Sequence, residues 1–234
     1  MFFAIFSLLL YGNKIFHKAN LVLIMKKKSI FLSLIVLLFC AVFTSCSSDE
    51  EITQESPSEE YVDKAKTILT NEIVLSTKAW MGTVDKTHLE SGCPTKFKFN
   101  WNDDGTMTLT LNDFHVGAMP FNITFKCKNK FMKLNTWEKD EYKGDGWVKF
   151  KGTDGVVSTT STDEDYKGGS GATVNGYLNV NTLQIQFIVD YNMMGVTSQC
   201  PLQVIDKNRI INFDAEFAQY EKDLAQWKKE NGEG

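Results

Sequence analysis

The amino-acid sequence predicts a mainly β protein, either an antiparallel β-barrel or, as the alternative, a β-sandwich, with a helix before the strands and another after them. Apolar and polar residues alternate in many short segments, and Gly, Asp and Asn separate these segments. Strands with one solvated face give this alternation, whereas buried parallel strands read as continuous apolar runs. Because no helical pattern interrupts the series, a barrel or a sandwich remains.

The composition is that of an ordinary globular protein. Among 234 residues, 43% are hydrophobic, four are Pro and five are Cys, which excludes collagen-like, coiled-coil, disulfide-dense and wholly disordered chains. Residues 1–45 carry five Lys and no acid, whereas the chain from Cys46 onward has 20 Lys and Arg against 29 Asp and Glu, a net charge of −9. This balance argues against nucleic acid as a partner.

The N-terminal region reads as an export signal. Met25 is followed by three Lys, an apolar stretch and small residues, so residues 25–45 are interpreted as a signal peptide. Residues 43–46, Phe-Thr-Ser-Cys, resemble a bacterial lipobox, with Phe in place of the usual Leu. Cys46 is therefore the predicted lipidation site, and its acyl chains would anchor the protein to a membrane.

The segments on either side of the signal peptide have separate interpretations. Residues 1–24 form another apolar run, which we interpret as a mis-assigned start, because polar residues shorten it below the length of a membrane-spanning helix. Residues 46–57 are an acidic, Ser-rich tether. The Ser-Ser-Asp-Glu-Glu after Cys46 also resembles the surface-export signal of Bacteroidetes lipoproteins, which implies an outer-membrane lipoprotein that faces the cell exterior.

Residues 58–234 are predicted to form a single domain that begins with a helix and a strand. Ser58 is a plausible N-cap, and the apolar residues after it recur at helical spacing, so a short helix is expected over 59–70. In the next segment the side chains alternate with a period of two, as on a β-strand, so a strand is expected over 73–84.

The most distinct local signal is a β-hairpin over residues 96–113. Aromatic residues alternate with Lys and Asn before Asp104-Gly105, and apolar residues alternate with Thr after it. Further strands are expected at 121–127, 146–151, 173–179, 183–190, 202–205 and 209–213. A C-terminal amphipathic helix is expected over 215–230, packed on the sheet or closing one end of the barrel.

Four segments of this β region carry a resemblance. They are Trp80-Met-Gly-Thr-Val, the run from Asp104 to Phe114, Met119-Pro-Phe-Asn-Ile-Thr-Phe, and the run from Gly176 to Phe187. Together they resemble calycin-like β-barrel lipoproteins of gut Bacteroidetes. The resemblance implies a calycin or lipocalin-type barrel on a secreted or surface lipoprotein, and it supplies no catalytic residues.

The cysteine and histidine inventory does not predict a metal site. His88 and Cys93 share a loop, but no second pair of ligands stands near them in sequence. An oxidising location favours one disulfide. Cys93 and Cys200 each precede a proline at a strand entrance, so they are the predicted pair, and Cys127 is the expected free thiol. No cofactor and no metal are predicted.

The remaining candidates are acidic and aromatic. Acidic clusters around Glu138 and at 163–165 could bind calcium or act in glycoside hydrolysis, but they match neither pattern and are interpreted as solvated charge. Trp137 and Tyr142 lie in a polar stretch and are the predicted exposed ligand contacts, although loop aromatics folded over the barrel mouth would give the same pattern.

The sequence thus predicts a non-enzymatic, lipid-anchored envelope protein. It would bind a small apolar ligand inside the barrel or a glycan at the rim. The alternative is a structural or protein-interaction module with a solid core, and a hydrolase stays open because catalytic groups can converge from anywhere in the chain.

Overall fold

The computed structural model describes residues 55–161 and 167–232, which belong to one compact unit. The predictions for the start of the chain, the signal peptide and Cys46 lie outside the described residues, as does the acidic cluster at 163–165. Within the described part, no helix is long and apolar enough to cross a membrane.

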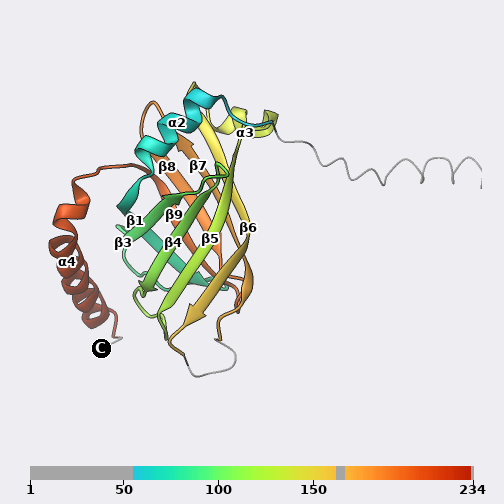
Figure 1. Ribbon diagram of the computed structural model, residues 1–234. Helices are drawn as coiled ribbons and strands as arrows, with labels where there is room; N and C mark the ends of the chain where they lie inside the picture. Colours follow the sequence, from blue (N-terminus) through green and yellow to red (C-terminus); the bar gives the residue numbers. More distant parts are fainter. Residues whose placement is uncertain (1–54, 162–166, 233–234) are drawn as a thin grey trace, which may run out of the picture. The chain divides into compact units, whose positions relative to one another are not determined.

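The described residues form a closed antiparallel barrel whose strands follow one another in chain order (Figure 1). The strands are β1 (Asn71–Met81), β2 (Val84–Asp85), β3 (Cys93–Trp101), β4 (Met107–Phe114), β5 (Ile123–Met132), β6 (Trp147–Thr159), β7 (Ser170–Asn179), β8 (Gln184–Asp190) and β9 (Val196–Val204). Pairing of β9 with β1 closes the barrel, and the short β2 pairs with the end of β1. The predicted barrel is confirmed, and the sandwich alternative is wrong.

Alternation along each strand separates the barrel interior from its outer face. On β5, Phe125 and Cys127 are buried, whereas Lys126 and Lys128 are exposed. The predicted hairpin is β3–β4. Its turn is held by Asp104, whose carboxylate accepts hydrogen bonds from the backbone N–H of Thr106 at 3.1 Å and from the Thr106 hydroxyl at 2.5 Å.

Aromatic rings fill the interior of the barrel. The ring centroids of Phe97 and Phe187 are 5.0 Å apart in an edge-to-face contact, and those of Phe131 and Phe150 are 5.7 Å apart. Gly176 on β7 makes room for this packing, because a Cβ atom there would lie 2.2 Å from Cζ of Phe150. The centre of the barrel is therefore a packed core, as small barrels commonly are.

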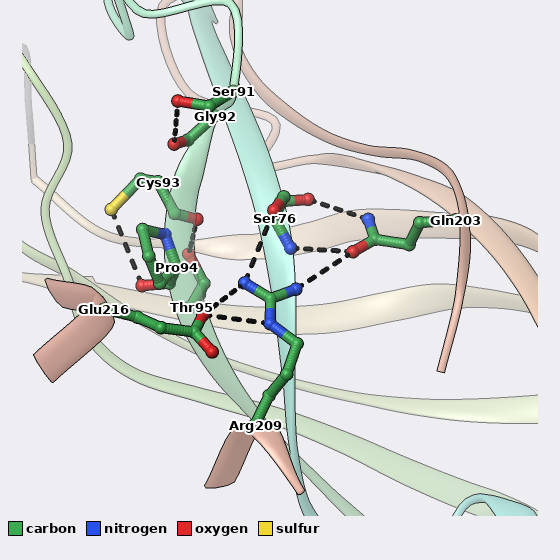
Figure 2. Close-up of polar contacts among 9 residues, drawn as sticks. All are labelled: Ser76, Ser91, Gly92, Cys93, Pro94, Thr95, Gln203, Arg209 and Glu216. Atoms are coloured by element: carbon green, nitrogen blue, oxygen red, sulfur yellow. Dashed lines mark hydrogen bonds and ion pairs between the residues drawn. The ribbon is translucent and has the colours of Figure 1, made fainter. Parts of the chain in front are cut away.

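The seam between β1 and β9 is completed by side chains (Figure 2). Backbone pairing runs from Met81–Val196 to Lys78–Gln199 and then stops. The same register would bring Pro201, which has no N–H to donate, opposite Ser76. Instead β9 bulges, and the Gln203 side chain accepts from Ser76 N at 2.9 Å and donates to Ser76 O at 3.0 Å.

Two short helices lie at one end of the barrel (Figure 1). Helix α2 (Glu59–Ile68) is capped by Ser58, and the Trp101 indole N–H donates to the Leu69 carbonyl at 2.7 Å. Helix α3 (Thr136–Glu141) was not predicted. Asn135 and Glu138 form a reciprocal capping box that starts it.

The C-terminal helix α4 (Arg209–Glu230) packs along β1 and β3 on the outside of the barrel (Figure 1). The predicted final strand over 209–213 is wrong, because this segment is the first part of α4. Ile210, Phe213 and Phe217 recur at intervals of three and four, which is the helical period. Moreover, β1 already pairs with β9, so a further strand has no free edge there.

Candidate functional site

A partly buried ion pair fastens α3 to the outer face of the barrel. Glu138 pairs with Lys149 on β6, both side chains being 12% exposed, and its carboxylate accepts a 2.8 Å hydrogen bond from the Tyr177 hydroxyl on β7. Burial by itself raises the pKa of Glu138. Hydrogen bonds from Lys149, the Asn135 backbone N–H and Tyr177 outweigh burial and hold this pKa below its usual value.

Tyr142 extends the same contact to β8. Its ring stacks on Tyr177 with centroids 4.1 Å apart and lies 4.9 Å from the Trp147 ring, while its hydroxyl accepts from the Gln186 side chain. Burial, together with the charges of Glu141 and Glu138, raises the pKa of Tyr142 to about 12. The phenol therefore stays neutral at physiological pH and serves as a hydrogen-bonding anchor for α3.

A groove of about 550 Å³ opens beside this contact, at the end of the barrel that carries α2 and α3. Its lining includes the rings of Tyr61, Tyr142 and Trp147 and the polar side chains Ser58, Lys133, Lys139 and Asp145. Aromatic surface with a few polar groups around it is the usual composition of a small-molecule or sugar site. Tyr61 comes from α2, so two elements far apart in sequence build the groove.

The structure separates the two predicted contact residues. Tyr142 lines the groove, but it is only 7% exposed, so the expectation that it forms an exposed surface is wrong. Trp137 is 83% exposed, and it is not among the residues that line the groove. Each residue of a helix turns by about 100°, so side chains two residues apart point to nearly opposite sides. Lys139 faces the groove, and Trp137 therefore points away from it.

The predicted disulfide does not form, since Cys93 and Cys200 are both free and buried. Cys93 is paired with Thr77 of β1, and Cys200 directly follows Gln199, the last β9 residue paired with β1, so β1 lies between the two cysteines. Two strand spacings amount to roughly 9–10 Å, which exceeds the reach of a disulfide. Cys127 is free as well.

Burial suppresses the reactivity of these thiols. It raises the pKa of Cys93 to about 12 and that of Cys127 to about 11, and it also raises the pKa of Cys200. A thiol rather than a thiolate is a poor nucleophile and a poor metal ligand. In the described part of the chain, no group of three His, Cys, Asp or Glu side chains is placed to hold a metal ion.

Comparison with known protein families shows which family the chain belongs to. The profile described as Domain of unknown function (DUF4903) matches residues 46–232, which include all the strands and helices above. The chain belongs to the DUF4903 family. No curated protein and no solved structure matches it. The architecture of this DUF4903 domain is thus the closed antiparallel barrel with helices α2, α3 and α4.

Sequence patterns pointed to only part of the groove in this DUF4903 domain. The capping box of Asn135 and Glu138 is visible in sequence as a polar residue followed three positions later by Glu, and it could have predicted α3. The convergence of Tyr61, Lys139 and Trp147 had no such signal. It depends on where α2 crosses the end of the barrel.

Proposed function

We propose that this DUF4903 protein is a non-enzymatic, lipid-anchored envelope protein that binds a glycan in the groove between α2 and α3. The observation that carries the proposal is the pair of partly exposed aromatic residues, Tyr61 and Trp147, that line the groove with Lys139 and Asp145, while the buried Tyr142 packs behind them. Sugar rings offer apolar faces that pack on aromatic surface and hydroxyl groups that bond to charged and polar side chains.

The packing of the barrel favours the groove over an internal ligand. Phe97, Phe150 and Phe187 occupy the centre, and Gly176 leaves no space beyond that taken by the Phe150 ring. An apolar ligand would have to displace these rings, which costs packing energy. A ligand at the rim meets no such cost.

The cellular location rests on the sequence alone. The lipobox-like segment before Cys46 and the acidic tether after it support an acylated protein on the outer face of the outer membrane. Mass spectrometry of the mature N-terminal peptide should find acyl chains on Cys46, and Cys46→Ser should release the protein from membranes. Protease added to intact cells should degrade the wild-type protein if it faces the exterior.

A glycan array tests the groove. We expect the wild type to bind a restricted set of glycans and Tyr61→Ala to lose that binding, because Tyr61 is a half-buried ring on the groove wall. Trp137→Ala is the matched control, since it removes an exposed aromatic ring outside the groove. Loss of binding in Trp137→Ala alone would instead support the contact predicted from sequence. No binding by the wild type would contradict the proposal.

The second candidate, a protein-interaction module, is favoured by a separate observation. Leu202 and Val204 are exposed apolar side chains two residues apart on β9, so they lie on the same face of that strand. Exposed apolar side chains that gather on one surface often mark contacts with other proteins. Crosslinking in intact cells from position 204 would support this role if it captured one defined partner.

A further inference from the structure

Lysines gather on the outer face of four neighbouring strands, β3 to β6, which lie side by side at the front of Figure 1. Lys126, Lys128 and Lys130 alternate along β5 with buried residues, so all three point outward and are exposed. The other exposed lysines of this face are Lys98 on β3 and Lys151 on β6, whereas the ammonium group of Lys96 lies 4.0 Å from the ring centroid of Phe213 on α4. We call Lys98, Lys126, Lys128, Lys130 and Lys151 the lysine face.

Lys126, Lys130 and Lys151 take part in none of the described ion pairs. Lys130 stands directly opposite Lys151 in the β5–β6 register, an arrangement that destabilises a sheet. Elsewhere on this face, Lys128 pairs with Asp104 at 2.5 Å, and Lys98 stands directly opposite the exposed Glu72 of β1. Asp154 is exposed on β6 nearby but makes none of these ion pairs. Uncompensated like charges on adjacent strands indicate an anionic partner.

The rest of the barrel surface does not share this character. The outward residues at the middle of β7 are Thr173, Asn175 and Tyr177, and those of β9 include Thr197 and Gln199. The charge of the chain from Cys46 onward is −9. The lysine face is therefore a local basic surface on an acidic protein, and its field acts at short range.

We propose that the lysine face binds an extended anionic polysaccharide. Successive lysines on β5 are about 6.6–6.8 Å apart along the strand, and those opposite each other on neighbouring strands are closer. Between Lys98 of β3 and Lys126 of β5 lies Thr110, which is partly exposed and pairs with both lysines, whereas Thr108 is buried and bonded to Asn102. Ammonium groups beside a threonine hydroxyl match a chain of sugar hydroxyls and regularly repeated acidic groups.

Two other polyanions fit this face less well. A membrane surface calls for apolar side chains that insert, and the exposed large apolar residue paired into this face is Val156 alone, opposite Lys126. Single-stranded nucleic acid calls for exposed aromatic rings between the basic residues, whereas residues between these lysines on β4 are Thr. The lysine face is separate from the groove at the barrel end, because none of its lysines lines that groove.

Binding to dextran sulfate tests the proposal, with unmodified dextran as the neutral probe. The full-length protein, purified in a nonionic detergent, should bind dextran sulfate at 150 mM salt and ignore dextran. The triple variant Lys126→Gln, Lys130→Gln, Lys151→Gln should bind at least about tenfold more weakly. Its plot of log affinity against log salt should be shallower by roughly two to three, one for each ammonium removed.

The matched control removes the same charge elsewhere. The control is the triple variant Lys222→Gln, Lys228→Gln, Lys229→Gln, whose three positions all belong to α4. It should keep the affinity and salt dependence of the wild type. Equal weakening in both triple variants would show a net-charge effect and overturn the site. A wild type that fails to bind dextran sulfate, or that binds duplex DNA equally well, would overturn the assignment to a polysaccharide. Thermal melts verify that both variants are folded.

Discussion

The side-chain amide of Gln203 replaces a backbone peptide beside Ser76. It accepts from the Ser76 N–H at 2.9 Å and donates to the Ser76 carbonyl at 3.0 Å, the two bonds that a paired strand residue would make (Figure 2). Arg209 lies against both residues and forms an ion pair with Glu216 at 2.7 Å. One side chain thus completes the closure of the barrel and joins it to the first turns of α4.

Gln203→Ala should therefore destabilise the protein by about 1–3 kcal/mol, because it leaves the Ser76 N–H and C=O without partners. Urea denaturation followed by circular dichroism measures the change. Gln199→Ala is the matched control on the same strand, where backbone pairing with Lys78 is intact, and it should cost less. Equal costs for the two variants would show that the Gln203 amide does not hold the seam.

Gly176→Ala should destabilise the barrel by about 1–3 kcal/mol through overpacking. The new Cβ would meet the Phe150 ring at 2.2 Å, and the ring is enclosed by Phe131 and Phe187. Phe150→Leu should relieve the clash, so the double variant should be more stable than the sum of the two single changes predicts. Additive behaviour would mean that the interior has spare room around Phe150.

Glu138→Gln should remove a pH-dependent part of the stability. The pKa of Glu138 is lowered in the folded protein, so its contribution is present above the unfolded pKa of about 4.5 and is lost as the pH falls through the folded pKa. The stability gap between wild type and variant should be largest near pH 7 and should close toward pH 3. Glu141→Gln, an exposed change on the same helix, should leave the wild-type profile intact.

In the folded protein, Cys93, Cys127 and Cys200 should react slowly with Ellman's reagent at pH 8. Burial raises the pKa of Cys93 to about 12 and that of Cys127 to about 11, so little thiolate is present, and the sulfur atoms are shielded. All three thiols should react at once in guanidinium chloride. A peptide that links Cys93 to Cys200 in a non-reducing digest would contradict the separation of these residues by β1.

The sequence alone determined the architecture of the domain. Alternation along segments such as Lys96–Trp101 and Ile123–Met132 is a local property, because the side-chain period of a strand is two, and it predicted both the strands and their antiparallel pairing. Residues 209–213 misled this reading, since five residues satisfy a period of two and the helical period alike.

Tertiary structure decided which residues meet. Closure of β9 on β1 placed β1 between Cys93 and Cys200 and so prevented the expected disulfide. The crossing of α2 over the barrel end brought Tyr61 to Trp147, and strand pairing collected lysines from β3, β5 and β6 on one face of an acidic protein. These are contacts between segments far apart in the chain, and a local pattern carries no information about such distances.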